Sequence, residues 1–368
     1  MENVFSNPSA ISFKDWLFLK TDKLPALAFY FLSKKNSTSP RFFPLFNEMK
    51  NLRIVVVKGT RFRYFDRIQI KLLRILVSIT YLKTKSYNWV FDVGYLLDKK
   101  PLTNQVLNLD DPEYSLAELN RIKAWEQKVI NCNFKNVIIV TSEYTKSYLS
   151  KSGVKSEIFV IYQGYSKNND LTPEKFRNFS IVYASPYIYS SNDKKFRVNS
   201  HWSVDLFISK IIPKIIEMDS NIDLYLIGRM GESSKDFLNK FSNVKLMGLL
   251  PINETSQVLA KCHVGLYPRT YDTYRQSQKI TEYIGANLPI VTFSLTDSDL
   301  VQKLDIGMCV DIGAVNKFAE AIISLKKSKK KVEEYESRIC SIKNDFSWSH
   351  LGARFDEIIS NKDKNLRK

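Results

Sequence analysis

The chain has 368 residues, of which 44% are hydrophobic and 13% aromatic, which is enough to bury two domain cores and excludes a disordered protein. Its formal net charge is +17, which favours an acidic partner such as nucleotide phosphates, an anionic membrane or nucleic acid. A generally basic, solvated surface is the alternative. Residues 31–90 hold much of the excess, with thirteen Lys and Arg against Glu48 and Asp66.

Several protein classes are disfavoured by what the sequence lacks. The four cysteines are scattered without a CxxC pair and the three histidines have no metal-ligand spacing, so we expect reduced thiols and no zinc site. The first ten residues do not have the charged and apolar regions of a signal peptide, and no run reaches the roughly 18 apolar residues of a membrane span. We therefore expect a cytoplasmic protein.

The first half alternates between strand-like and helix-like segments, which is typical of an α/β domain with a parallel sheet. We predict strands at 53–57, 89–93, 106–109, 137–140 and 158–161. Helices are predicted over 66–83, over 113–130 with a cap from the turn Asp110-Asp111-Pro112, and over 143–149 with Ser142 as N-cap and Gly153 at its end.

A polar stretch over 166–179 is interpreted as an interdomain linker, and a second α/β series follows it. We predict strands at 181–184, 223–227 ending at Gly228, 244–247 ending at Gly248, and 264–267. Helices are predicted over 203–218, 253–261 and 316–325, and the lysine run 326–331 is interpreted as a solvated helix end or loop.

The segment 278–293, QKITEYIGANLPIVTF, is the most informative in the chain. It reads as a short helix, a turn, and a buried strand, with Gly285 suited to the helix end and Pro289 to the strand start. Lys279 and Glu282 are three residues apart, which places them on one helical face. A helix N-terminus favours phosphate, and an acid beside it can bind a sugar hydroxyl.

This segment resembles the donor-binding segment of GT-B glycosyltransferases, especially those of retaining glycosyltransferase family 4. The order of VTSEYTKSYLSKSGV, NIDLYLIGRMGE, NVKLMGLLPINETSQVLAKCHVGLYP and DFSWSHLGARFDEIIS along the chain is also similar to that family, over roughly residues 136–360. Residues 1–105 are compatible with an α/β half and carry no recognised motif.

The resemblance implies a fold of two Rossmann-like domains that face each other across a cleft. We expect an N-terminal acceptor domain at 1–165, the linker at 166–179, a nucleotide-sugar-binding domain at 180–345, and a C-terminal helix at 346–368 that crosses back. It further implies a glycosyltransferase that moves a sugar from a nucleotide-sugar donor to a glycan, glycolipid or other hydroxyl acceptor, with retention of configuration at the transferred sugar. No cofactor and no metal are expected.

Donor-binding roles follow from the resemblance. In that family the carboxylate matching Glu282 binds hydroxyls of the nucleotide donor, whereas the plain alternative is an acid placed for the helix dipole. The family often has a second acid eight positions earlier, but that position is Tyr274 in this chain. This difference leaves the sugar contact and the donor's identity open. Lys279 is a candidate to neutralise the charge of the diphosphate, and the alternative is an ordinary exposed lysine. The backbone N–H groups of Ser277 and Gln278 are candidates to bind the β-phosphate.

Further donor contacts are expected from two regions of the second domain. The family takes phosphate-binding cations from the loop after the first strand and from the strand that ends in Gly, which here supply Lys194, Lys195 and Arg197, and Arg229. A lid or acceptor role is the alternative for the first loop. The backbone that would bind the base matches Gly248 and Leu249.

Catalytic residues are harder to place, because enzymes of this kind need no protein nucleophile and act by positioning and charge stabilisation. Residues 1–165 contain no histidine, which excludes a histidine base from that domain. Asp110 and Asp111 follow a strand, where they could orient an acceptor hydroxyl or act as base. The alternative that we favour for them is a helix cap with first-turn acids.

Arg61, Arg63 and Arg67 are candidates for an anionic acceptor or membrane. The segment 66–83 pairs basic with apolar residues, which suggests peripheral contact with the cytoplasmic face of an anionic membrane that holds a lipid-linked acceptor. A helix packed on the sheet with basic rims fits equally well.

Three other functions compete with the transferase. A catalytically inactive GT-B-like binding or scaffold protein is suggested by Tyr274 and by the missing histidine. A sugar-nucleotide epimerase of the same fold is disfavoured by that missing histidine and by the C-terminal resemblance. Nucleic-acid binding lacks any recognised module, so no nucleic-acid partner is expected.

Overall fold

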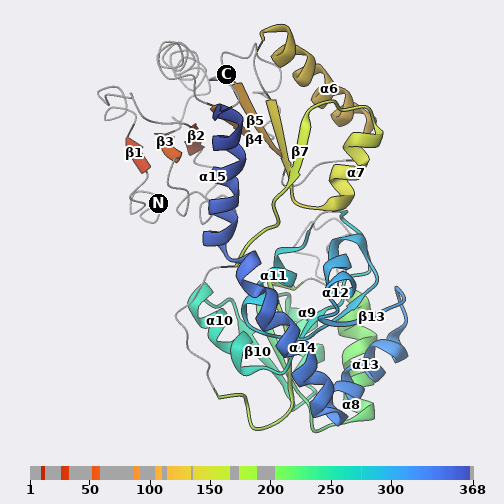
Figure 1. The fold of residues 1–368 in the computed structure, drawn as a ribbon. Helices are drawn as coiled ribbons and strands as arrows, with labels where there is room; N and C mark the ends of the chain where they lie inside the picture. The colour runs from red at the N-terminus through yellow and green to blue at the C-terminus, as the bar shows by residue number, and fades with distance from the viewer. Residues whose placement is uncertain are drawn as a thin grey trace. The chain divides into compact units, whose positions relative to one another are not determined.

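The computed structural model describes residues 10–12, 26–32, 52–58, 87–91, 104–109, 114–133, 136–165, 174–188, 204–274 and 276–364, the first four of these ranges as backbone alone. The chain divides into two compact units (Figure 1). The first unit comprises residues 1–162 with 348–368, and the second comprises residues 163–347. Both are α/β units built on parallel sheets, as the sequence predicted.

The first unit holds a parallel sheet in which the described strands follow the order β1-β3-β2-β4-β5-β6-β7. Apolar residues of β5 and β6 pack with the helices into one core. The strands cover Ala10–Ser12, Ala26–Leu32, Leu52–Lys58, Tyr87–Phe91, Asn104–Leu109, Asn136–Val140 and Glu157–Val160 (β1 to β7). The helices described with this unit cover Leu116–Asn131 (α6), Glu143–Lys151 (α7) and Trp348–Lys364 (α15).

Helix α7 is capped as predicted, whereas α6 is not. Ser142 accepts a hydrogen bond from the backbone N–H of Thr145, at 3.1 Å. The prediction that the turn Asp110-Asp111-Pro112 caps α6 is wrong. Helix α6 begins at Leu116, and its N-cap is Ser115, whose side chain accepts a hydrogen bond from the N–H of Glu118. A serine three residues before a glutamate is itself an N-terminal signal that the acid-rich turn obscured.

The second unit holds a six-stranded parallel sheet of order β10-β9-β8-β11-β12-β13 in its described part. The strands cover Ser180–Ile188, Asp223–Met230, Val244–Gly248, Val264–Tyr267, Ile290–Phe293 and Gly307–Val310 (β8 to β13). Numbered from β8, this is the 3-2-1-4-5-6 order of a doubly wound sheet, in which the strand order reverses between β8 and β11. Ligands of such sheets bind beyond the carboxyl ends of the strands at this reversal.

The helices of this unit follow the strands in sequence. They cover Phe207–Ile211 as a π-helical turn (η2), Ile212–Met218 (α8), Glu232–Leu238 (α9), Ile252–Lys261 (α10), Gln278–Gly285 (α11), Thr296–Ser298 as a 3-10 turn (η3), Asp299–Lys303 (α12), Val315–Lys327 (α13), Lys329–Ile342 (α14) and Lys343–Phe346 (η4).

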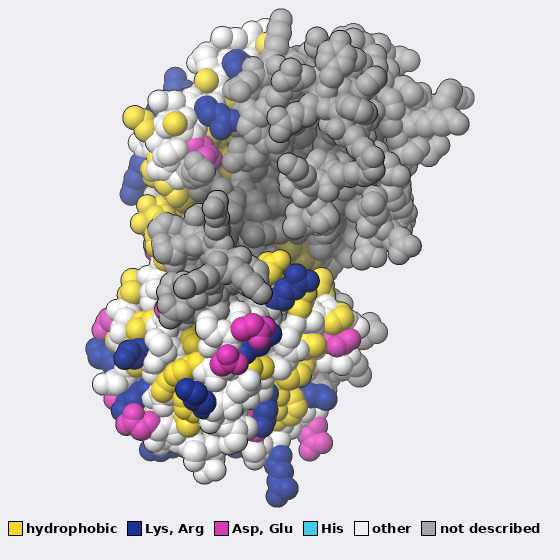
Figure 2. Space-filling view, turned by 180° about the vertical axis from the view of Figure 1, so that it is seen from behind, with side chains coloured by type: hydrophobic (Ala, Val, Ile, Leu, Met, Phe, Trp, Pro, Cys, Tyr) yellow, Lys and Arg dark blue, Asp and Glu magenta, His cyan; other side chains and the backbone are white. Residues whose placement is uncertain are grey.

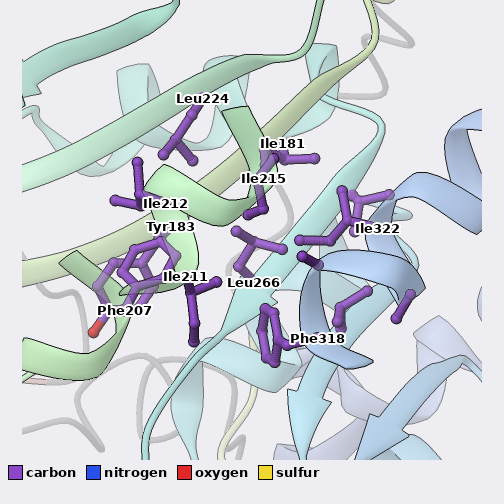
Figure 3. Close-up of a cluster of buried hydrophobic side chains, with 14 of the residues drawn as sticks. Ile181, Tyr183, Phe207, Ile211, Ile212, Ile215, Leu224, Leu266, Phe318 and Ile322 are labelled. Carbon is purple, nitrogen blue, oxygen red and sulfur yellow. The ribbon is translucent and has the colours of Figure 1, made fainter. Parts of the chain in front are cut away.

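The largest core of this unit lies between the sheet and helices α8 and α13 (Figure 3). Ile212 and Ile215 of α8 and Phe318 of α13 are at most 2% exposed and meet Leu224 and Leu266 of the strands. Burying an aliphatic or aromatic side chain of this size stabilises the fold by about 1.5–3 kcal/mol. The apolar, β-branched strands are therefore covered on this face.

Two local features differ from the prediction. The helix expected over 203–218 is not a regular α-helix, because η2 precedes α8 and Pro213 stands at the start of α8. Proline lacks an N–H and its ring clashes with the carbonyl four residues earlier, which favours such a π-type irregularity. The strand expected to end at Gly228 continues to Met230, and a Cβ on Gly228 would lie 1.9 Å from the carbonyl oxygen of Ser185.

The lysine run 326–331 spans the junction of α13 and α14. Ser328 separates the two helices and its side chain accepts a hydrogen bond from the N–H of Lys331. Lys327, Lys329 and Lys330 are exposed, as expected, whereas Lys326 is partly buried, with its Nζ 2.6 Å from Oδ2 of Asp219. Figure 2 shows basic and acidic side chains interspersed on the drawn face of the described residues of this unit, so no single patch there accounts for the net charge.

Candidate functional site

Helix α11 follows β11 through the loop 268–277 and carries the first group of candidate residues. Ser277 is its N-cap residue, and Gln278 and Lys279 are its first two helical residues. The Ser277 side chain makes no capping hydrogen bond, so no capping hydroxyl occupies the N–H groups of the first turn. The helix therefore offers the kind of N-terminus that attracts an anion.

The packing of Tyr283 fixes α11 on the sheet. Its hydroxyl donates to the carbonyl of Leu266 at 2.9 Å and accepts from the N–H of Ala184 at 3.3 Å. These contacts join α11 to β11 and β8, the two strands between which the strand order reverses. Gly265 makes room for the ring, because a Cβ there would lie 2.8 Å from two ring atoms. Gly265 and Tyr283 therefore place α11 at this point of the sheet.

Glu282 lies on the second turn of α11, partly buried. Burial raises the pKa of its carboxyl group, and the charge of Lys279 opposes that shift. Among the described residues, no donor hydrogen-bonds this carboxylate, and Lys279 is its electrostatic partner. A partly buried acid with so little compensation is costly for folding, which marks it as a functional candidate.

Other predicted donor residues lie at the carboxyl end of the neighbouring strands. Gly248 is the last residue of β10, with φ +67° and open space where a Cβ would stand. Leu249 follows it and is 52% exposed. Arg229 lies near the end of β9 with its guanidinium carbon 5.9 Å from the centre of the Tyr187 ring. Because parallel strands end at one edge, these residues share the edge that carries the loop 268–277.

Tyr274 stands in the loop 268–277 in a left-handed conformation, with φ +58°. It is 37% exposed. A bulky residue with positive φ is uncommon and needs support from its surroundings. That support comes from Asp272, whose Oδ1 accepts a hydrogen bond from the Tyr274 N–H at 2.8 Å.

A polar network that no sequence pattern predicts lies beneath this loop. Asp297 is fully buried, and its Oδ2 accepts hydrogen bonds from the Tyr267 hydroxyl at 2.7 Å and from Thr273 Oγ1 at 2.9 Å. Arg269 lies beside it, with Nη1 3.7 Å from that oxygen. Burial raises the pKa of Asp297, an effect that the Tyr267 hydrogen bond and Arg269 oppose. No spacing in the sequence connects residues that lie this far apart along the chain.

His263 lies away from this edge, just before β11 begins. Its Nδ1 accepts from the N–H of Ser180, the first residue of β8, at 3.0 Å, and its ring stacks on Phe179. Burial lowers the pKa of the imidazole, and Lys175 adds to this effect. The neutral ring therefore joins the amino ends of β8 and β11.

Several predicted site residues lie outside the described residues. These are Arg61, Arg63, Arg67, Asp110, Asp111, Lys194, Lys195 and Arg197. Within the described part, no group of three His, Cys, Asp or Glu side chains is arranged to hold a metal ion. No helix in that part is long and apolar enough to cross a membrane.

Part of the sequence matches a known protein family. Residues 196–328, somewhat more than a third of the chain, match the family described as "Glycosyl transferases group 1". No curated protein matches the sequence. The match includes η2 to α13 and therefore every described candidate residue of α11 and of the loop before it.

Solved structures show the same fold at low identity. A structure of HepE from Anabaena in complex with UDP superposes with a TM-score of 0.64 at 13% identity, covering 92% of this chain and all of that one. WaaG, a glycosyltransferase involved in lipopolysaccharide biosynthesis, gives 0.52 at 11%, covering 91% and 99%.

A TarM mutant from S. aureus in complex with Fondaparinux, alpha-GlcNAc-glycerol and UDP gives a TM-score of 0.56 at 14% identity. The alignment covers 77% of this chain and 58% of the TarM chain, so this protein spans less than two thirds of that relative. The chain has the GT-B fold. Within this fold, residues 196–328 are similar to the group 1 glycosyltransferases.

Proposed function

We propose that this protein is a glycosyltransferase and that it takes its sugar from a nucleotide-sugar donor bound at the carboxyl edge of the second unit's sheet. The diphosphate would lie at the N-terminus of α11, and Glu282 would accept hydrogen bonds from hydroxyls of the donor. HepE and TarM, which have the same fold, were solved in complex with UDP. That supports a uridine nucleotide as the first donor to test.

The observation that carries the proposal is the Glu282 carboxylate beside Lys279. Its pKa is raised by burial, and no described residue donates a hydrogen bond to it. A sugar hydroxyl would supply the missing donor and offset the cost of burying the charge. A bound ligand therefore explains the position of this acid on the helix better than a purely structural role does.

Charge at this edge suits a diphosphate. Lys279 is a cation in the first turn of α11, where the helix dipole also favours negative charge. Arg229 lies at the same edge and is positioned by Tyr187. We infer that side-chain cations and the helix end stabilise the departing nucleoside diphosphate, so that transfer needs no metal ion.

The acceptor is proposed to be a glycan or glycolipid hydroxyl, with retention of configuration at the transferred sugar. WaaG is described as acting in lipopolysaccharide biosynthesis, which supports a glycan or lipid-linked acceptor for a protein of this fold. Peripheral contact with an anionic membrane, on its cytoplasmic face, is part of the same proposal. Sedimentation with anionic vesicles at low and high salt tests it, and the absence of binding at low salt would refute membrane contact.

A thermal-shift screen against UDP, GDP, ADP, CMP, TDP and their sugars tests the donor site. A ligand at about a hundred times its Kd stabilises the fold by roughly 2.7 kcal/mol, a shift of several degrees. We expect one nucleotide class to stabilise the wild type and to lose that effect in Glu282→Ala. Glu254→Ala, on the exposed surface of α10, is the matched control and should keep it.

A second assay separates transfer from binding alone. Tyr274 stands where the family has a second acid, which favours an inactive binding protein as the alternative. Release of the nucleoside diphosphate from the donor identified above, with and without a mixture of glycan acceptors, distinguishes the two. Binding without any release would favour the inactive protein, and the anomeric proton coupling of a transferred sugar would establish or exclude retention.

A further inference from the structure

The short segment Thr296–Asp297, at the start of η3, contacts the last residue of β11 and two places in the loop 268–277 that follows it. At the end of β11, Tyr267 donates its hydroxyl to Asp297 Oδ2 at 2.7 Å. At the middle of the loop, Thr273 Oγ1 donates to the same oxygen at 2.9 Å. At its end, the N–H of Ser277, the N-cap of α11, donates to the Asp297 carbonyl at 3.2 Å.

Asp272 completes the connection from the loop side. Its Oδ2 accepts from the N–H of Thr296 at 2.8 Å, and the Thr296 hydroxyl donates to its Oδ1. The same Oδ1 accepts from the N–H of Tyr274 and so closes a turn that carries Tyr274 at φ +58°. One carboxylate thereby ties Tyr274 to Thr296.

We propose that Asp272, Thr296 and Asp297 form a brace that holds the loop 268–277 in its donor-binding conformation. The inference rests on the proposed function, because the braced loop carries Tyr274 and leads into the α11 N-terminus. Asp272 and Asp297 are positioning residues in this scheme. They hydrogen-bond to other residues of the protein, and these bonds determine where the backbone of Tyr274 and Ser277 lies.

Three reasons separate the brace from ordinary loop packing. Tyr274 adopts a left-handed conformation that a tyrosine does not favour, so the loop would relax if its support were removed. Burying an acid is costly unless hydrogen bonds offset the cost, and Asp297 is buried where it accepts hydrogen bonds from Tyr267 and Thr273. The contacts also reach the strand end before the loop, the middle of the loop and its end from a single two-residue segment.

The primary test compares Asp272→Ala with Asp272→Asn, Thr296→Val and the control Asp299→Ala. Asp299 belongs to the same stretch of chain but forms an exposed ion pair with Lys303. Hydrogen–deuterium exchange of peptides spanning 268–277, without nucleotide, reports the loop directly. Titration calorimetry with UDP, and then with GDP, ADP, CMP and TDP if UDP gives no heat, reports binding well below the melting temperature.

We expect Asp272→Ala to speed exchange in the loop and to raise the Kd of the nucleotide about tenfold, since the binding-competent loop becomes a minor state. Asp272→Asn keeps an oxygen that can accept from Tyr274, so it should recover much of both effects. Thr296→Val removes one hydrogen bond and should fall between the wild type and Asp272→Ala. Asp299→Ala should match the wild type in both measurements.

Unchanged exchange in Asp272→Ala would overturn the brace. Faster exchange with an unchanged Kd would show that the brace does not serve donor binding, and would overturn the proposal as well. If the wild type binds none of the five nucleotides, the proposed function fails and the role of the brace in donor binding fails with it. That result is distinguishable from the others because it appears in the wild type before any variant is compared.

Discussion

The ring of Tyr165 lies directly against Gly285, the last residue of α11: a Cβ built on that glycine would stand 2.4 Å from two ring atoms. Tyr165 is 8% exposed, and its N–H donates to the carbonyl of Phe346 at 3.0 Å. Tyr165 and Phe346 each lie close to a boundary between the two units. The C-terminal end of α11 is therefore packed against Tyr165, which is itself hydrogen-bonded to Phe346.

Gly285→Ala should destabilise the protein, because the added methyl group cannot fit while the Tyr165 ring keeps its place. Overpacking of this kind costs about 1–3 kcal/mol of the free energy of unfolding. Urea denaturation measures it. In a Tyr165→Ala background, Gly285→Ala should cost clearly less, since the clashing ring is gone. Additive losses in the double variant would show that the glycine is needed for another reason.

Glu282→Gln should stabilise the fold at neutral pH while weakening donor binding. The folded-state pKa of Glu282 is raised by burial, so the folded protein binds the proton more tightly than the unfolded chain does. Its contribution to stability therefore falls as pH rises from the ordinary glutamate pKa through the raised one. The amide avoids that loss, so the gain should be larger at pH 7 than at pH 4.

Urea denaturation of the wild type and Glu282→Gln at both pH values measures this gain, and titration with the identified nucleotide measures the affinity. Stability that rises equally at pH 4 and pH 7 would contradict the assigned pKa direction. Unchanged affinity would remove Glu282 from the donor site.

Asp219→Asn should destabilise the protein more at pH 7 than at pH 3. Lys326 Nζ donates to Asp219 and this hydrogen bond lowers the pKa of the carboxyl group, although burial opposes the shift. The ionised acid therefore contributes stability above the ordinary aspartate pKa, and the contribution is lost as pH falls through the lowered pKa. We expect about 1 kcal/mol or less, because the pair is not fully buried.

The ion pair of Lys317 with Asp311 is the matched control for this measurement. Both of its side chains are more than half exposed. Asp311→Asn should therefore leave urea midpoints within error of the wild type at both pH values. An equal loss in the two variants would mean that burial of the Asp219 pair adds nothing.

The cysteines should differ sharply in reactivity, although all four are free thiols. Burial raises the pKa of Cys262 to about 12 and that of Cys309 to about 11, whereas Cys340 is exposed. The thiolate is the reactive form, so iodoacetamide at pH 8 should label Cys340 first and leave Cys262 unlabelled in the native protein. Peptide mass spectrometry measures this, with urea-unfolded protein as the control. Early labelling of Cys262 would show that the region before β11 opens.

Much of the second unit could be predicted from local sequence. Runs such as Val264–Tyr267 and Ile290–Phe293 are short, apolar and bounded by turn residues, and they form strands β11 and β12 as expected. Ser142 caps α7 through its own hydroxyl, a contact between near neighbours in sequence. These features depend on backbone preference and hydrophobic period, which a single segment carries within itself.

Gly285 shows where local reasoning reached its limit. Helix α11 ends at Gly285 as expected, but the residue with φ +57° beyond the helix is Asn287. Gly285 is instead required by the Tyr165 ring, which comes from a segment far away along the chain. Periodicity cannot reveal which side chain will press on a given glycine.

The sequence by itself determined the α/β class, most strand and helix positions of the second unit, and the placing of Lys279 and Glu282 on α11. The tertiary structure alone decided the strand order, which sets the β8–β11 reversal beside that helix, and the brace of Asp272 and Asp297 beneath the loop. The physical reason is range. Helix and strand signals act over a few residues, whereas buried hydrogen bonds join groups that only the folded chain brings together.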